Sequence, residues 1–204
     1  MPERLTLAQE QVLAIAPKPS AVISFFASLY IIATVLTNVE KRKKMYHRLM
    51  TALSFHSALQ SVWFFWGTWA IPEGLVYLSA GTTTTCTAQG FLIQFSLVIP
   101  TYYSSLSVFA YFTMHSTAMN EAIHRVEPLV HGLLHVFPLA SSIALQQIEM
   151  LNPNGPWCWI ESFPPGCGKD TYPCVRGGGM SAEVAMWAFA GAPFFFMLFL
   201  STVT

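Results

Sequence analysis

Residues 86–114 read CTAQGFLIQFSLVIPTYYSSLSVFAYFTM, a stretch without a single charged side chain. It lies inside a longer charge-free interval between Glu73 and Glu121. A helix needs roughly 20 mostly apolar residues to cross a bilayer, so this stretch is long enough for one span. The threonines at positions 82–85 are β-branched and poor helix formers. We therefore expect the span to start at about Cys86 and the residues before it to form a loop.

Charged residues divide the rest of the chain into four further apolar stretches. Of the 204 residues, 53% are hydrophobic and 10% are charged, whereas soluble domains carry about 25% charged residues. We predict an all-α polytopic membrane protein in a lipid bilayer, with a transmembrane domain over 19–204 and spans near 20–39, 49–72, 86–114, 128–149 and 183–204. Residues 1–18 would form a tail outside the membrane.

Basic residues between the first two spans predict the orientation. This short connection contains Lys41, Arg42, Lys43 and Lys44, with Arg48 close behind. Short loops rich in Lys and Arg stay in the cytoplasm. We expect these five residues on the cytoplasmic side, where a transducer would bind, and the N-terminal tail and the 150–181 loop outside the cell. The formal net charge of zero gives no reason to expect nucleic-acid binding.

All four cysteines lie on the outer side in this orientation. Disulfides persist in oxidising compartments, and four cysteines allow three pairings. We expect Cys86, at the outer end of the third span, to pair with Cys158 and so hold the 150–181 loop over the mouth of the bundle. Cys167 and Cys174 would then close a small loop, remain free or form intermolecular bonds. A four-cysteine zinc site is the alternative, but the spacings lack the paired C-x-x-C signature.

An outer cysteine at the top of the third span, joined to one in the second outer loop, resembles the arrangement in G protein-coupled receptors. The local sequence is similar to the cyclic-AMP-receptor-like and secretin-like group, and in particular to the divergent receptor-like proteins of diatoms and related protists. The similar segments are TCTAQGF (85–91), IQF (93–95), WCWI (157–160), YHRLM (46–50), WAIP (69–72) and PTYYSSLSV (100–108). Together they cover most of residues 41–160.

The resemblance implies an orphan receptor in the plasma membrane that passes a signal from an extracellular small molecule to a heterotrimeric G protein. Two features depart from the family pattern. Many relatives carry an acidic residue where this chain has His56, so the role of that carboxylate does not carry over. The family has seven spans and this sequence stops after five, so we expect a partial bundle; a truncated, non-signalling receptor fragment is the alternative.

Polar side chains inside the spans predict where a ligand would bind. Because polar groups are costly in hydrocarbon, they usually face the bundle interior or a wet cavity. Gln89 and Gln94 lie beneath Cys86, and their amides both donate and accept hydrogen bonds. Tyr103 belongs to a polar stripe of the same span. We name these three residues as candidates for a pocket open to the outside.

Histidines provide the basis for a different function. His131 and His135 are four residues apart on one face of the fourth span, where they could share a metal, although helix packing is the commoner explanation; we predict no metal site and no cofactor. With His56 they could instead form the proton path of a transporter, although no span contains an acidic residue and no half-to-half repeat is visible. No arrangement of nucleophile and base indicates an enzyme.

Overall fold

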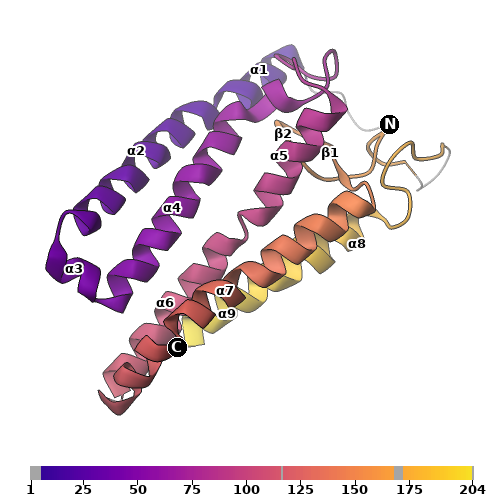
Figure 1. Ribbon diagram of the computed structural model, residues 1–204. Coiled ribbons are helices and arrows are strands. Elements are labelled where there is room, and N and C mark those ends of the chain that lie inside the picture. The colour runs from indigo at the N-terminus through magenta and orange to yellow at the C-terminus, as the bar shows by residue number, and fades with distance from the viewer. Residues whose placement is uncertain (1–5, 116, 168–171, 204) are drawn as a thin grey trace.

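The computed structural model describes residues 6–115, 117–167 and 172–203, and most of them are helical. Figure 1 shows long helices side by side, with a small hairpin and irregular loops at one end. In chain order the elements are α1 (Leu7–Ile15), α2 (Pro17–Leu36), α3 (Val39–Lys43), α4 (Met45–Trp66), the 3₁₀ turn η1 (Gly67–Ala70), α5 (Thr83–Phe95), α6 (Val98–His115), α7 (Thr117–Gln147), β1 (Leu151–Asn154), β2 (Trp157–Ile160), α8 (Ala182–Met186), the π-helical turn η2 (Trp187–Gly191) and α9 (Ala192–Val203).

Four helices of the described residues are long and apolar enough to cross a membrane: Leu7–Leu36, Thr83–Met114, Arg125–Gln147 and Ala182–Val203. They correspond to the first, third, fourth and fifth predicted spans. The second predicted span is α4, which has 22 residues but is more polar than the others because it carries His56, Gln60 and several serines. Composition therefore supports four of the five expected spans, and α4 packs as a more polar helix between α2 and α6.

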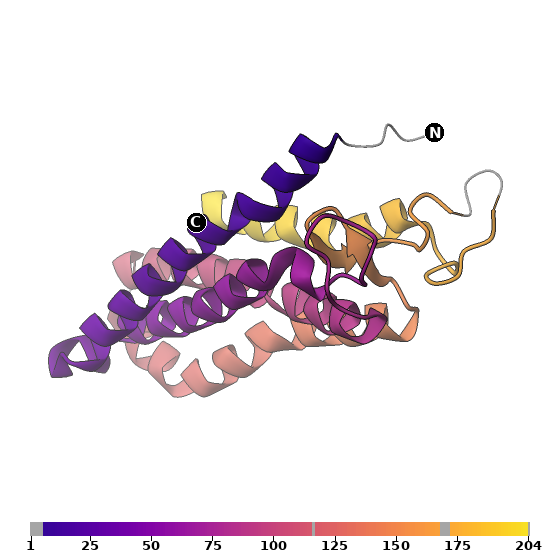
Figure 2. The ribbon, with the colours of Figure 1, turned by 90° about the horizontal axis from the view of Figure 1, so that it is seen from above.

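The N-terminal segment is helical where we expected a tail. Thr6 and Gln9 form a capping box, in which each side chain bonds the other's main chain, and such boxes start helices. Ala16 keeps helical dihedral angles between α1 and α2, and Pro17 is accommodated because it stands at the first position of α2, where its missing N–H costs nothing. Figure 2 shows α1 and α2 as one long helix that crosses the remaining helices at an angle.

The third predicted span is two helices with an earlier start. Thr82 and Thr85 form a capping box, so α5 begins at Thr83, and the expected loop at these threonines is wrong. β-Branching disfavours threonine inside a helix, but its hydroxyl makes it a good cap. The helical run breaks between Phe95 and Val98, and Pro100 then lies in the first turn of α6, where a proline is tolerated.

The 150–181 loop contains a two-stranded hairpin that the sequence analysis did not predict. β1 and β2 pair antiparallel, with Leu151 opposite Ile160. Gly155, in the tight connection, has a φ of +66°, a conformation that glycine adopts at no steric cost. Leu151 and Ile160 are buried with Leu145 of α7, so the hairpin is packed onto the end of the bundle.

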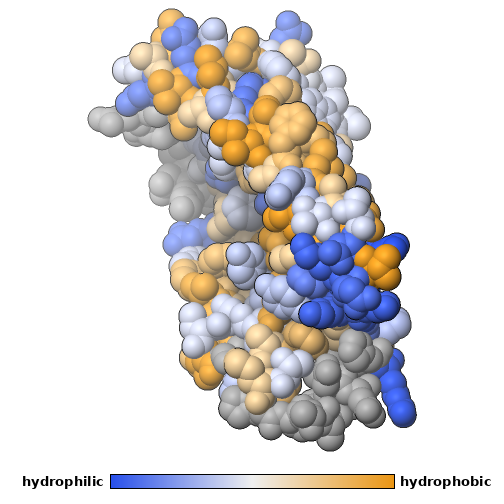
Figure 3. Space-filling model, turned by 90° about the vertical axis from the view of Figure 1, so that its left-hand side faces the viewer, coloured by the Kyte–Doolittle hydropathy of each residue, from blue (hydrophilic) through white to orange (hydrophobic). Residues whose placement is uncertain are grey.

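The two ends of the bundle differ in charge. The hairpin lies at the end where the chain begins, and α9 ends at the opposite end (Figure 1). In Figure 3, which shows the side of the molecule where α2 and α3 lie, hydrophilic side chains gather in the lower half of the face and hydrophobic ones predominate above them. Arg42, Lys43 and Lys44 are exposed in and just after α3. These three basic residues therefore lie at the end of the bundle away from the hairpin.

Candidate functional site

The disulfide end of the molecule, which we define as residues 67–90 and 150–181, is held by two cystine bridges. Cys86 and Cys158 are bonded with their Cα atoms 5.3 Å apart, and both are buried against Ile71. Cys167 and Cys174 are bonded across a sequence separation of 7 residues. The alternative of a zinc site has no support from the described residues, among which no group of three or more His, Cys, Asp or Glu side chains could hold a metal.

Gly90, in the TCTAQGF segment, lets α5 approach the hairpin closely. A Cβ atom at this position would lie 3.1 Å from Cβ of Leu151 and 3.4 Å from the carbonyl oxygen of Cys158. Contacts this short leave little room for any side chain. The segment therefore supplies both a cysteine for the bridge and a glycine for the close approach.

Gln89 is a structural residue, and its proposed place in an open pocket is wrong. Its side chain is fully buried. Nε2 donates to the carbonyl oxygens of Trp63 and Gly67, at 3.1 and 3.0 Å, and Oε1 accepts from the backbone N–H of Cys158 at 2.8 Å. Because the nitrogen and the oxygen of its side-chain amide both bond to main-chain groups, Gln89 joins the end of α4 to the hairpin. Neither atom is left for a ligand.

Gln94, five residues further along α5, is also a structural residue. It is fully buried, its Nε2 donates to Ser141 Oγ and to the carbonyl oxygen of Phe189, and its Oε1 accepts from Trp159 Nε1 at 2.9 Å. This amide therefore links α5 to α7, to η2 and to β2. The expectation that Gln94 lines an open pocket is also wrong.

Tyr103 points to the outside of the bundle. Its side chain is 62% exposed and lines a shallow groove between α6 and α9 together with Phe194. Its neighbours Tyr102 and Ser104 are the buried residues of this turn. Ser104 of the predicted polar stripe thus faces inward, whereas Tyr103 faces outward, and the buried tyrosine is Tyr102, which the stripe did not include. The expectation that Tyr103 lines a pocket with Gln89 and Gln94 is wrong.

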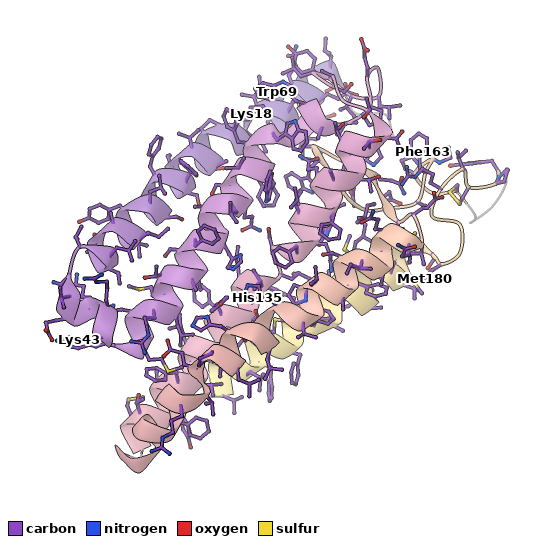
Figure 4. The ribbon with its side chains drawn as sticks, viewed as in Figure 1. Lys18, Lys43, Trp69, His135, Phe163 and Met180 are labelled. Atoms are coloured by element: carbon purple, nitrogen blue, oxygen red, sulfur yellow. A yellow bond between two sulfur atoms is a disulfide. The ribbon has the colours of Figure 1, made fainter. Side chains whose placement is uncertain are left out.

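Tyr102 joins the three histidines that the sequence grouped as a possible proton path, and together they form the histidine cluster of His56, Tyr102, His131 and His135. The Tyr102 hydroxyl is 2.7 Å from His131 Nδ1, and the His56 ring stacks on Tyr102 with centroids 5.8 Å apart. His135 Nδ1 is 2.6 Å from the His131 carbonyl oxygen. The cluster therefore joins α4, α6 and α7, and Figure 4 shows His135 in the middle of the bundle.

One hydrogen bond of the cluster indicates the tautomer of His135. A carbonyl oxygen only accepts, so the Nδ1–H group of His135 donates a hydrogen bond to the His131 carbonyl oxygen. His135 Nε2 and His56 Nε2 are 3.0 Å apart, so one proton lies between these two rings. His131 and His135 use their ring nitrogens for different partners, so they do not jointly present ligands to a metal, as one alternative proposed.

An ion pair extends the cluster toward the basic residues. Arg48 donates two hydrogen bonds to the carboxylate of Glu127, whose side chain is only 13% exposed. Glu127 Oε1 is also 3.8 Å from His131 Nε2. Arg48 further donates to the carbonyl oxygens of Arg42 and Lys43. We expected Arg48 to be available to a transducer, but its guanidinium group instead bonds to groups of this chain.

The remaining candidates on the basic side form a short exposed helix. Asn38 caps α3 by accepting a hydrogen bond from the backbone N–H of Lys41. Lys43 pairs with Glu40 at 2.9 Å, and both side chains are more than two-thirds exposed. Such a pair adds little stability, so α3 presents its cations to solvent or to a partner.

Lys18 fastens the opposite end of α4 to α2. Its Nζ donates to the carbonyl oxygen of Phe65 at 2.8 Å and lies 3.6 Å from the ring centroid of Trp69; Figure 4 shows the two labelled side chains together. A cation over an indole face is attracted by the ring quadrupole. The aromatic residues at this end of α4 therefore include a cation-binding face, in addition to the membrane belt typical of tryptophan.

Comparison of the chain with protein-family models, with curated proteins and with solved structures finds no match.

Proposed function

We propose that this chain acts as a receptor of the G protein-coupled type, with the disulfide end outside the cell and the basic residues of α3 facing a cytoplasmic transducer. The sequence resemblance supports the family, and the asymmetric distribution of Lys and Arg supports the orientation. The plasma membrane is the location that such a function requires. The observation that carries the proposal is a cavity at the disulfide end that contains an unpartnered polar group.

This cavity has a volume of about 220 Å³ and lies between α1, the loop that follows η1, and the hairpin region. Leu13, Leu75 and Phe163 are among the apolar residues that line it. Thr68 also lines it, and its hydroxyl is buried without a hydrogen-bond partner in the described part of the chain. Ligand pockets are typically apolar with a few placed polar groups, so the ligand would be a small, largely apolar molecule with one hydrogen-bonding group.

Thr68 occupies a position from which a ligand could act on the rest of the bundle. It follows Gly67, whose carbonyl oxygen binds Gln89 of α5. α4 runs from this point to Arg48, which pairs with Glu127 of α7. A ligand that binds one arrangement of these helices more tightly shifts the population toward it. We propose that the ion pair differs between the two arrangements.

A test begins with a screen of small apolar compounds for those that raise the melting temperature of the purified protein. Hits are then assayed for ligand-dependent nucleotide exchange on co-reconstituted G proteins. Thr68→Val removes the hydroxyl and keeps the shape, and we expect it to weaken a hit by about tenfold, the value of one buried hydrogen bond. Thr34→Val is the control, because the Thr34 hydroxyl bonds its own helix at Tyr30.

The outcomes separate binding from signalling. Equal affinity of hits for Thr68→Val and the parent protein would remove the cavity from the proposal. Stabilising ligands that never promote nucleotide exchange, with any G protein tried, would contradict the receptor function while leaving a binding protein.

The histidine cluster favours a second candidate, a proton-linked transporter. His56 and His135 contact each other, and His131 lies next to Glu127. Glu127 therefore supplies an acidic residue at one end of a proton path through these histidines. Chains of His and carboxylate side chains carry protons in membrane pumps. Proton flux into liposomes, measured with an entrapped pH dye and abolished by His135→Phe, would support this candidate over the receptor.

A further inference from the structure

Among the residues that the structure describes, Arg176 forms no salt bridge with an acidic side chain. Its Nη2 donates to Thr87 Oγ1 at 3.2 Å, and its Nε is buried with no hydrogen-bond partner among the described residues. A guanidinium group has five N–H donors in a fixed fork that matches phosphate and carboxylate oxygens. Leaving a buried donor unsatisfied is costly, and no described residue supplies the acceptor that this donor lacks.

The backbone around Arg176 is fixed. Arg176 and Phe163 form an isolated antiparallel bridge, with the N–H of each bonded to the carbonyl oxygen of the other at 3.1 and 3.0 Å. Figure 4 places Phe163 among the loops beyond the hairpin. The backbone of Arg176 is therefore fixed, and the hydrogen bond from Nη2 to Thr87 orients the guanidinium group, which lowers the entropy lost on binding.

Arg176 lies at the polar end of a groove between α5 and the end of α7. The groove has a volume of about 490 Å³, and its polar lining residues are Thr83, Thr84, Thr87, Gln146 and Arg176. Ala88, Phe91 and Leu92 also line it, further along the same face of α5 as the threonines. The hydroxyls of Thr83 and Thr84 are on exposed residues and can donate to oxygen atoms. The groove thus combines a cation and hydroxyl donors with an apolar wall.

We propose that this groove binds the headgroup phosphate of an anionic phospholipid, with the adjoining acyl chains along Phe91 and Leu92. The location favours a lipid, because Thr83 begins one candidate membrane span and Gln146 lies near the end of another. The groove is therefore at the depth of lipid headgroups. None of the described residues that line it is acidic, so these residues offer no partner to the choline of a zwitterionic lipid. A headgroup with net negative charge is therefore preferred.

Native mass spectrometry of the full chain in detergent tests this proposal directly. The protein is titrated with dioleoyl phosphatidylglycerol or with dioleoyl phosphatidylcholine, and the occupancy of bound lipid is measured. We expect phosphatidylglycerol to bind about tenfold more tightly, the value of a charge-assisted hydrogen bond at a partly exposed site. Arg176→Gln should reduce its affinity to that of phosphatidylcholine, and Arg176→Lys should restore part of the difference, because the charge returns without the fork.

Two further variants control for folding and for general charge. Thr87→Val keeps the arginine and removes the hydroxyl that accepts from its Nη2, and we expect a loss of about threefold because the fork is less well oriented. Arg125→Gln removes an exposed arginine at the start of the same candidate span that ends at Gln147, and it should leave lipid preference unchanged.

Three results would overturn the proposal. Equal affinity of the parent protein for the two lipids would remove the anion preference, and unchanged lipid preference in Arg176→Gln would assign it to another site. If inorganic phosphate at millimolar concentration displaces phosphatidylglycerol completely, the groove is a site for free phosphate and the acyl chains contribute nothing.

Discussion

At the disulfide end, polar side chains bind mainly to backbone groups, whereas in the histidine cluster they bind to one another. Gln89 and Asn152 each satisfy two carbonyl oxygens, and a covalent bridge lies beside them. The cluster instead brings together ionisable rings from three helices. Backbone partners do not titrate and do not change rotamer. The disulfide end should therefore carry most of the stability, and the cluster should be the part that can rearrange.

The largest effect should come from removing the bridge between Cys86 and Cys158. The bridged residues are 72 positions apart, and in the chain-entropy account the loss of such a loop destabilises the folded state by about 4 kcal/mol. The double variant Cys86→Ser and Cys158→Ser should melt far below the parent protein in detergent, as measured by circular dichroism.

The second bridge provides the comparison. Cys167 and Cys174 are only 7 positions apart, for which the same account gives about 2 kcal/mol. Their double serine variant should therefore melt closer to the parent. Equal melting temperatures for the two double variants would mean that loop length does not determine stability at this end.

The next effect should come from Gln89→Leu, which keeps the size of the side chain and removes its hydrogen bonds. Two carbonyl oxygens and the N–H of Cys158 would lose a buried partner, and we expect a cost of about 3 kcal/mol. Gln60→Leu in α4 is the matched control, because no side-chain hydrogen bond of Gln60 is found among the described residues. Comparable losses in both variants, measured by thermal unfolding, would assign the effect to leucine itself.

Glu127→Gln should have a smaller effect on stability. It removes the charge that pairs with Arg48, whose side chain is one-third exposed, and solvent screening reduces the loss to about 2 kcal/mol. Glu40→Gln breaks the largely solvated pair with Lys43 and should change stability by less than about 1 kcal/mol. If both variants unfold alike, the Arg48 pair is no stronger than a surface contact.

The sequence predicted what depends on composition and on local chemistry. Charge-free stretches indicated four helices that the structure contains, because a span of roughly 20 apolar residues is a strong signal. The capping boxes at Thr6 and Thr82 were also readable in principle, since a threonine followed three residues later by a side chain that can bond back is a recognised start signal. At the third span, the low helix propensity of threonine predicts a start at Cys86, whereas capping by Thr82 lets α5 begin at Thr83.

The contacts of the polar residues could not be predicted in the same way. Gln89 and Gln94 were correctly placed beneath Cys86, but whether an amide faces a cavity or the backbone depends on the hairpin, which lies more than 60 residues away. Likewise, one residue of helical rotation separates the buried Tyr102 from the exposed Tyr103. The pairing of Arg48 with Glu127 required the packing of α4 against its neighbours. Such contacts join residues that are far apart in the sequence, so they cannot be predicted from any one local stretch.

The smallest effect should be found at the hydrogen bond between His56 and His135. Interhelical hydrogen bonds in membrane proteins contribute about 0.6 kcal/mol on average, and His56→Phe retains an aromatic ring that can stack on Tyr102. A double-mutant cycle with His135→Phe should therefore give a coupling energy of about this size. A coupling above about 3 kcal/mol would show that the cluster holds the helices as firmly as the disulfide end does. The contrast between a fixed end and an adaptable cluster would then fail, and with it the reason for placing conformational change at the histidines.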